Sequence, residues 1–345
     1  MPSPSDRFGA TSRRGFLEVC AVALAAPAAS PQSHGDGLVR FGRTDLWVSR
    51  LCQGTAFRQL TRDADDARAQ QILRHCIDIG VNFFDSSNAY GWGGSEMALG
   101  KAIAGRRDKV VICTKVSPIL KPEGSTPSKK VALTRDFVFR EAEGSLKRLG
   151  TDHIDLYLFH NPDNVTPPEA LAETMDALVR SGKIRYWGAS NFNAPEVASL
   201  VKLARRKGKA PIAGLEDYYN LIAGDRRTFM ERELFPLIRQ GLLGLMAFSP
   251  LGEGRLAPGR PIDPAAPWAP VVTALDKVAK ELGATRPQVC VAWVLSHPEV
   301  TTVLAGAERP EHVDDNLRGT QIKLPADALR MLTAASDAIP VMKAG

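Results

Sequence analysis

The sequence predicts an α/β protein in which eight β/α units close into one barrel of parallel strands, a (β/α)8 TIM barrel. Three observations carry this prediction. Eight short runs are continuously apolar, which is typical of parallel strands covered on both faces. Amphipathic helical segments separate these runs over about 270 residues, a usual length for such a barrel. A doubly wound sheet is not indicated, because the first strand leads into Gly54-Thr55-Ala56-Phe57 without a GxGxxG fingerprint.

The elements follow one another in a regular order after a predicted β-hairpin over 38–48, which has Gly42-Arg43-Thr44 at its centre. The predicted strands span residues 50–54, 81–85, 110–116, 154–160, 184–190, 213–219, 243–249 and 302–306. The predicted helices span residues 65–79, 95–104, 134–149, 167–181, 194–206, 226–240 and 269–282, and we expect an extra helix at the C-terminus. Candidate N-caps are Ser95, Thr134 and Asn193, and candidate C-caps are Gly80, Gly150 and Gly182.

The composition is that of a globular protein with a large core. Of 345 residues, 44% are hydrophobic and 24% are charged, and no apolar run reaches the ~18 residues of a membrane span. The formal charge of +6 is scattered along the chain, so no nucleic-acid partner is predicted. The five cysteines are widely spaced, with no CxxC pair, and therefore predict neither a metal site nor a disulfide framework.

The N-terminus predicts a targeting segment. Residues 12–17 read Ser-Arg-Arg-Gly-Phe-Leu, a short apolar stretch covers 19–29, and Ala26-Pro27-Ala28 offers a small-residue cleavage site. The arginine pair resembles the twin-arginine export signal of bacteria. We therefore expect a signal peptide over 1–28, a linker over 29–37, a barrel domain over 38–345, and a periplasmic or secreted protein exported by the twin-arginine machinery. The alternative is a disordered tail on a cytoplasmic protein.

Ionisable residues stand at the ends of three neighbouring predicted strands. The second strand ends in Asp85 and leads to Tyr90, the third ends near Lys115, and the fourth ends at His160. Barrel enzymes build their active sites at the C-terminal ends of strands, so these four side chains should converge at one mouth.

This set of side chains predicts acid–base chemistry on a carbonyl or an alcohol. A phenol has a pKa near 10, which a nearby ammonium lowers, and a carboxylate keeps that ammonium charged. An imidazole can share the phenol's proton. Tyr90 is therefore the expected general acid for a carbonyl or general base for an alcohol, while the hydride must come from a cofactor.

Several motifs resemble those of the aldo-keto reductase family. Residues 81–91 read Val-Asn-Phe-Phe-Asp-Ser-Ser-Asn-Ala-Tyr-Gly and continue to Ser95-Glu96 and Leu99-Gly100, which resembles the family signature. Residues 111–115, 158–163 and 182–192 resemble its lysine, histidine and fifth strands. The resemblance implies a catalytic tetrad of Asp85, Tyr90, Lys115 and His160. It also implies an NADP(H)-dependent oxidoreductase that reduces an aldehyde or ketone, aldoses included, with the cofactor lying across the barrel mouth.

The resemblance also implies the cofactor contacts. Ser190 and Asn191 match residues that bind the nicotinamide carboxamide, and Tyr219 matches an aromatic residue that stacks on the ring. The segments implied for the remaining parts of the cofactor contain Gly54, Thr55, Ser249, Leu251, Gly252, Gly306, Arg309, His312, Asp315 and Asn316.

Two positions depart from the family pattern. Glu216 matches a glutamine that grips the nicotinamide carboxamide, so the resemblance implies Glu216 as a cofactor contact; a carboxylate can accept a hydrogen bond from the amide but cannot donate one. His312 replaces a usual glutamine or arginine near the expected 2′-phosphate. NADP(H) is therefore the expected cofactor, with NAD(H) not excluded.

The substrate pocket is expected to be partly aromatic. Its candidate residues are Phe57, Trp92, Asn161, Trp187 and Tyr218, which would suit many small carbonyl compounds or alcohols. Two alternatives stay open. One is an NAD(P)-dependent sugar or alcohol dehydrogenase with Tyr90 as base, and the other is a nicotinamide-binding, redox-sensing regulatory module. The sequence does not predict an oligomeric state.

Overall fold

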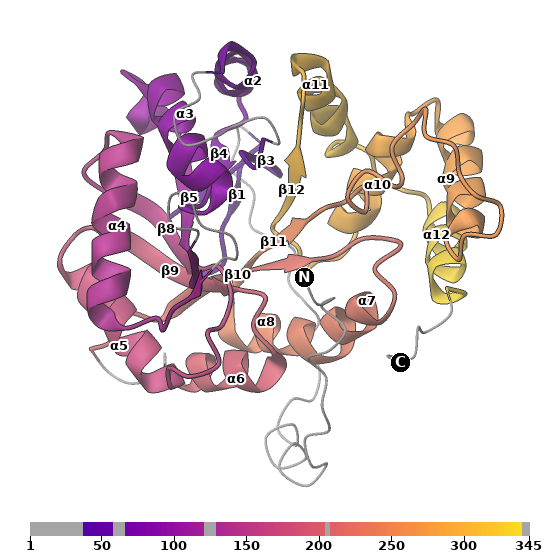
Figure 1. Cartoon of the computed structure of the whole chain (residues 1–345). Coiled ribbons are helices and arrows are strands. Elements are labelled where there is room, and N and C mark those ends of the chain that lie inside the picture. The colour runs from indigo at the N-terminus through magenta and orange to yellow at the C-terminus, as the bar shows by residue number, and fades with distance from the viewer. Residues whose placement is uncertain (1–36, 58–65, 121–128, 204–207, 340–345) are drawn as a thin grey trace, which may run out of the picture.

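The protein folds as a closed barrel of eight parallel strands surrounded by helices (Figure 1). The computed structural model describes residues 37–57, 66–120, 129–203 and 208–339. The predicted signal peptide over 1–28 and all but the last residue of the predicted linker lie outside the described residues. The strands follow the chain around the barrel, and the last of them pairs with the first. The predicted (β/α)8 class is confirmed.

All eight predicted barrel strands are present, with ends that differ from the predicted ones by two residues at most. The strands are β3 (Leu51–Gly54), β4 (Phe83–Asp85), β5 (Val111–Val116), β8 (Ile154–Phe159), β9 (Ile184–Ser190), β10 (Ile212–Tyr218), β11 (Gly244–Phe248) and β12 (Thr302–Gly306). A small antiparallel pair, β6 (Ile119–Leu120) and β7 (Lys129–Lys130), lies outside the barrel.

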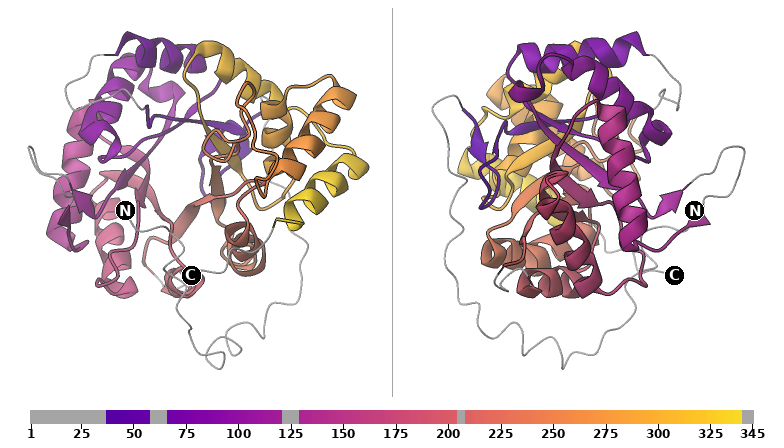
Figure 2. Two further views of the ribbon diagram at one scale, coloured as in Figure 1. Left: turned by 45° about the vertical axis from the view of Figure 1, so that its right-hand side comes forward. Right: turned by 90° about the vertical axis from the view of Figure 1, so that its left-hand side faces the viewer.

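Helices cover the outside of the barrel (Figures 1 and 2). They are α2 (Ala67–Asp78), α3 (Gly94–Ile103), α4 (Arg135–Leu149), α5 (Pro168–Arg180), α6 (Ala194–Leu203), α8 (Phe235–Gly241), α9 (Ala269–Leu282), α10 (Arg286–Leu295), α11 (Pro310–Gly319) and α12 (Ala326–Asp337), with short helical segments η2 (Tyr90–Gly93), η3 (Arg107–Lys109), α7 (Asp225–Phe229) and the π-helical η4 (Met230–Leu234). The C-terminal extra helix is confirmed as α12. The predicted helix over 226–240 is divided by η4, and α10 and α11 were not predicted.

The helix caps follow the predictions in part. Thr134 caps α4 by accepting a hydrogen bond from the Phe137 amide at 3.4 Å, and Gly150 ends that helix with a φ of +64°. Ser95 was wrongly predicted as an N-cap. It lies inside α3, and its hydroxyl donates to the Thr55 carbonyl at 2.6 Å, so it ties the helix to the end of β3.

The predicted N-terminal hairpin closes the floor of the barrel. Its strands β1 (Val39–Arg40) and β2 (Trp47–Val48) pair antiparallel, and Phe41 between them is fully buried. The Phe41 ring lies against Gly214 of β10 and Gly244 of β11, where a Cβ atom would come within 2.5–2.6 Å of ring carbons. These two glycines therefore make room for an aromatic plug.

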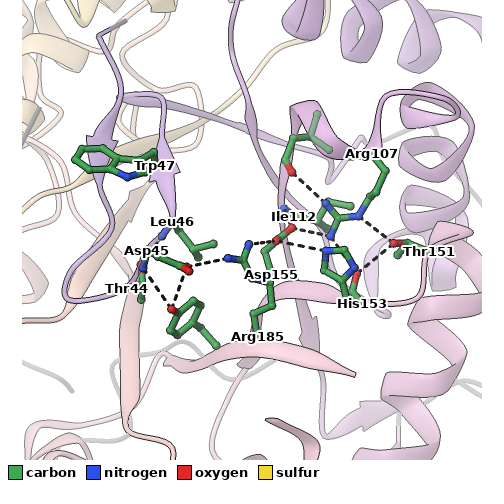
Figure 3. Close-up of polar contacts among 12 residues, drawn as sticks. Thr44, Asp45, Leu46, Trp47, Arg107, Ile112, Thr151, His153, Asp155 and Arg185 are labelled. Carbon is green, nitrogen blue, oxygen red and sulfur yellow. Dashed lines mark hydrogen bonds and ion pairs between the residues drawn. The ribbon is translucent and has the colours of Figure 1, made fainter. Parts of the chain in front are cut away.

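A charged network holds the hairpin to the same end of the barrel (Figure 3). Asp155, 2% exposed near the start of β8, accepts hydrogen bonds from the Ile112 amide at 2.9 Å, from Arg107 at 2.7 Å and from Arg185 at 2.9 Å. Arg185 also contacts Asp45 of the hairpin at 2.8 Å. The network joins β5, β8 and β9 at their N-terminal ends, the face on which barrels build stability rather than catalysis.

The four cysteines of the described residues are free and buried. Cys52 and Cys113 lie in barrel strands, and Cys76 and Cys290 lie in helices. Among the described helices, none combines the length and the apolar character needed to cross a bilayer.

The contact between Phe41 and Gly244 at the barrel floor can be tested by substitution. Gly244→Ala places a methyl group 2.6 Å from three carbons of the Phe41 ring, so we expect the free energy of unfolding to fall by about 1–3 kcal/mol. Adding Phe41→Leu should restore part of the loss, which urea unfolding followed by circular dichroism would measure as a coupling energy. Strictly additive effects of the two substitutions would contradict the proposed contact.

Candidate active site

The alternation of side chains along the barrel strands decides which residues reach the site. Successive side chains of a strand point to opposite faces, so Gly214, Glu216 and Tyr218 of β10 share one face. Gly214 contacts the Phe41 plug, which identifies this face as the barrel interior. Tyr219 therefore belongs to the outer face.

The structure brings the four predicted catalytic side chains together at the C-terminal end of the barrel. Asp85 is the last residue of β4, Lys115 lies near the end of the adjacent β5, and His160 follows β8 directly. Tyr90 is the first residue of η2. Each therefore sits where a strand or its following loop opens toward the barrel mouth, as predicted.

Lys115 is the centre of the cluster. Its ammonium is 0% exposed and donates to both carboxylate oxygens of Asp85 at 2.6 Å, to the Ser86 carbonyl at 3.0 Å and to the Tyr90 hydroxyl at 3.3 Å. Burial alone would lower the pKa of Lys115, but the negative charges of Asp85 and Glu216 raise it well above its ordinary value. The lysine is therefore a fixed positive charge beside the phenol.

His160 is the second side chain in contact with the Tyr90 hydroxyl. Its Nε2 is 3.5 Å from the Tyr90 oxygen, and its Nδ1 is 3.0 Å from the Ser87 hydroxyl. Burial, and then the charge of Lys115, lower the pKa of His160 to about 3, so the imidazole is neutral at neutral pH. Ser87 was not predicted to take part, although it lies within the quoted signature two residues after Asp85.

The pKa of Tyr90 is shifted in the direction opposite to that expected. Burial is the largest effect and raises this pKa above its ordinary value. The charge of Lys115 opposes the shift, while the charges of Asp85 and Glu216 add to it. The expectation included the effect of the ammonium on the phenol and left out the effects of burial and of the two carboxyl groups on that same phenol. Tyr90 is therefore held as a protonated phenol.

The loop that carries Tyr90 is fixed by Asn88. The Asn88 side chain accepts from the backbone N–H of Ser117 at 3.0 Å and donates to Glu141 of α4 at 2.9 Å. The backbone N–H of Asn88 donates to the Lys115 carbonyl at 3.2 Å. These bonds tie the loop to β5 and to α4. The position of the Tyr90 hydroxyl is thereby set by backbone contacts as well as by Lys115 and His160.

The predicted carboxamide-binding pair lies at the end of β9. Asn191 has a φ of +61°, and its Nδ2 donates to the His160 carbonyl at 3.0 Å and to the Ser190 hydroxyl at 2.9 Å. Its Oδ1 accepts from Arg226 at 2.7 Å. The Asn191 side chain is thus held beside the tetrad by contacts that sequence reasoning did not foresee.

Other predicted cofactor residues leave space, or a hydroxyl without a partner, for a bound group. Gly54 and Gly306 end the paired strands β3 and β12, and nothing lies within 4 Å of a Cβ atom at Gly306. The buried Thr55 hydroxyl has no hydrogen-bond partner among the described residues. After β11, Ser249 and Gly252 have φ values of +59° and +54°, so this loop, which includes the half-buried Leu251, turns sharply at the mouth.

The start of α11 fits an anionic group. Arg309 is exposed at the N-cap position and donates to His312 Nε2 at 2.8 Å. A helix N-terminus with an adjacent guanidinium attracts phosphate. Asn316 is buried on the same helix. The half-buried Asp315 carboxylate accepts from Thr285 at 2.9 Å and Gln288 at 2.6 Å and so joins α11 to α10.

Two predicted aromatic contacts are wrong. The Tyr219 ring is fully buried on the outer face of the barrel wall, stacked on Trp293 at 5.4 Å between ring centroids, and its hydroxyl donates to Glu231 at 2.8 Å. Trp187 is also buried outside the barrel, where its Nε1 donates to the Ala210 carbonyl at 3.0 Å. Neither ring faces the barrel mouth, and the alternation along β9 and β10 could have shown this.

The aromatic residues that do face the mouth include one that was missed. Phe248, the last residue of β11, is half-buried and packs edge-on against Tyr218 with the ring centroids 5.5 Å apart. Arg226 lies over the Tyr218 ring at 5.7 Å. Trp92 and Asn161 are half-buried in the loops after β4 and β8, while Phe57 belongs to the main core cluster.

Comparisons with known proteins agree with this geometry. The Aldo/keto reductase family model matches residues 50–337. The uncharacterized oxidoreductase YrpG of Bacillus subtilis is 36% identical over 310 residues, 84% of this chain and 93% of that protein. A probable voltage-gated potassium channel subunit beta of Oryza sativa is 31% identical over 81% of this chain and 90% of its own length.

A solved structure has the same fold. The thermostable aldo-keto reductase Tm1743, crystallised with the inhibitor epalrestat, superposes with a TM-score of 0.71 at 30% identity, covering 86% of this chain and 99% of that one. With the family matched over most of the chain and the tetrad assembled at the barrel mouth, the protein belongs to the aldo/keto reductase family of oxidoreductases.

Proposed function

We propose that the protein is an NADP(H)-dependent reductase of aldehydes or ketones. The observation that carries this proposal is the setting of the Tyr90 hydroxyl, which lies 3.3 Å from a charged lysine and 3.5 Å from a neutral histidine. Such a phenol can give its proton to a carbonyl oxygen as a hydride arrives at the carbon. The bound cofactor would supply that hydride.

Each member of the tetrad has a distinct task in this proposal. Tyr90 is the general acid, and Lys115 stabilises the phenolate that remains after the proton has moved. Asp85 holds the ammonium in place through two short hydrogen bonds. His160, neutral and fixed by Ser87, orients the carbonyl oxygen toward the phenol. The near-complete burial of Lys115 and Asp85 keeps water away from their charges.

The residues at the edge of the barrel support a dinucleotide as the cofactor. The small residues at the ends of β3 and β12 leave room for it, and Ser190, Asn191 and the loop after β11 would hold its nicotinamide and pyrophosphate parts. Arg309 and His312 at the start of α11 would bind a 2′-phosphate, which favours NADP(H) over NAD(H).

The raised pKa of Tyr90 keeps the phenol in the protonated form with which carbonyl reduction begins. Alcohol oxidation needs Tyr90 as a base, and burial together with two nearby carboxyl groups opposes its ionisation. The regulatory alternative rests on the similarity to a potassium channel subunit beta. The assembled tetrad supports catalysis as the first function to test.

Tyr90→Phe tests the proposal. We expect turnover of an aldehyde and ketone panel with NADPH to fall by at least about 10²-fold, because the proton donor is lost. NADPH binding, measured by fluorescence titration, should stay nearly unchanged. Tyr186→Phe is a matched control, since Tyr186 lies at the barrel floor with its hydroxyl on Asp45. Equal turnover of the wild type and Tyr90→Phe would sink the reductase assignment.

Arg309→Met tests the cofactor preference. Loss of the guanidinium should weaken NADPH binding by about tenfold or more and leave NADH binding unchanged, because only the former carries the 2′-phosphate. Arg318→Met removes a charge from the exposed end of the same helix and should change neither affinity. A parallel loss of both cofactors in Arg309→Met would show that Arg309 does not read the phosphate.

We also propose that residues 1–28 direct export through the twin-arginine machinery. The Arg13-Arg14 pair and the following apolar stretch support this. Replacing both arginines with lysine keeps the charge but removes the pair. We expect fractionation of a bacterial host to find processed wild type in the periplasm and the unprocessed double variant in the cytoplasm. Unprocessed wild type in the cytoplasm would overturn the proposal.

A further inference from the structure

Glu216, which the resemblance places against the nicotinamide carboxamide, also lies beside the tetrad. Its side chain is 3% exposed on the inner face of β10, and its Oε2 is 3.2 Å from the Lys115 nitrogen. The carboxyl group therefore contacts the lysine inside the barrel. This is the position at which the chain departs from the glutamine usual in the family.

The N–H groups of Lys115 are all used by other acceptors, so none is left to donate to Glu216. An ammonium has three N–H groups, and those of Lys115 already serve four acceptors, namely both carboxylate oxygens of Asp85, the Ser86 carbonyl and the Tyr90 hydroxyl. Among the described residues, Glu216 Oε2 has no hydrogen-bond partner despite its short separation from the ammonium. An ionised carboxylate that is buried without a donor is strongly disfavoured.

The charge balance of the cluster leads to the same result. Carboxyl oxygens of Asp85 and Glu216 and the sulfur of Cys113 all lie within 4.8 Å of one another, around the single ammonium of Lys115. Two ionised carboxylates would leave this buried cluster with a net negative charge, and one proton neutralises it. Asp85 already accepts two bonds of 2.6 Å, so the proton belongs on Glu216.

We propose that Glu216 is a positioning residue that carries a proton at neutral pH and acts through Lys115 to keep Tyr90 protonated as the pH rises. The first proton to leave the cluster for solvent is then that of Glu216. Its new negative charge beside Lys115 opposes the release of the Tyr90 proton. This inference rests on the proposed reductase function, in which Tyr90 is the general acid.

The shifts of the individual groups agree in direction. Burial, and then the charge of Asp85, raise the pKa of Glu216 well above its ordinary value. The charge of Glu216 in turn raises the pKa of Tyr90. The titratable and charged groups that surround the cluster, from β3, β4, η2, β5 and the residue after β8, are Cys52, Asp85, Tyr90, Cys113, Lys115 and His160.

Infrared spectroscopy of the full chain without substrate tests the protonation state directly. We expect the C=O stretch of a protonated carboxyl group at mildly alkaline pH in the wild type and its loss in Glu216→Gln. Asp217→Asn is the matched control, because Asp217 lies on the outer face of β10 and pairs with Arg226 at 3.3 Å, and burial raises its pKa only to about 6. The control should retain the Glu216 band.

Identical carboxyl bands in the wild type and Glu216→Gln would mean that Glu216 is ionised, which overturns the inference. This readout needs neither cofactor nor turnover. It therefore separates a failure of the inference from a failure of the proposed function.

The pH dependence of the reaction tests the effect on Tyr90. In Glu216→Gln the alkaline limit of carbonyl reduction should move to lower pH by at least about one unit, since a unit charge a few ångströms away is removed. Glu216→Asp keeps an ionisable group and should move the limit back toward that of the wild type. The ultraviolet titration of the tyrosinate, with Tyr90→Phe subtracted, should shift in the same direction without substrate.

A uniform loss of activity in Glu216→Gln with an unmoved alkaline limit would assign Glu216 a merely structural role and overturn the inference. Thermal unfolding of each variant checks that the barrel is intact. If Glu216→Gln fails to fold, titration of the infrared band in the wild type and in Glu216→Asp decides the question. A carboxyl band that is absent from both at neutral pH contradicts the proposal.

Discussion

The buried ion pair between Lys115 and Asp85 is the interaction on which the site depends. Removing two charges from water is costly, and only short, well-directed hydrogen bonds offset that cost. Both carboxylate oxygens of Asp85 lie 2.6 Å from the Lys115 nitrogen, with neither side chain more than 1% exposed. The charges of this pair act on every other member of the cluster. Tyr90 shares the remaining hydrogen-bonding capacity of the ammonium, and Glu216 is excluded from it.

The opposite end of the barrel supplies the rigidity that such a pair requires. Phe41 fills the floor between Gly214 and Gly244. The network around Asp155 joins the first residues of three strands to the hairpin. The strands therefore enter the site end of the barrel from a fixed base. Small displacements of β4 against β5 would lengthen the 2.6 Å contacts, so the packing of the floor and the chemistry of the mouth are linked through the strands.

The sequence predicted the barrel and the tetrad because both leave local signals. Continuous apolar runs identify the strands, and ionisable residues at their ends identify the mouth. The errors have physical causes of two kinds. The predictions for Tyr219 and Trp187 leave out the two-residue alternation along β10 and β9, which turns both rings outward. The contact between Arg226 and Asn191 and the sign of the Tyr90 shift depend on distances between elements far apart in the chain, which no local pattern contains.

An acid at position 216, where the resemblance implies an amide, differs from that amide less in shape than in charge. A protonated carboxyl group and a carboxamide both offer one donor face and one acceptor face, so the two resemble one another while the proton is held. The expectation that Glu216 can only accept a hydrogen bond assumed an exposed, ionised carboxylate. Burial and the charge of Asp85 raise the pKa of Glu216, so that assumption does not hold here. A catalyst leaves the equilibrium between carbonyl and alcohol unchanged. The two carboxyl groups beside the Lys115 ammonium therefore act only on the protonation state in which Tyr90 meets its substrate, and they favour the protonated phenol.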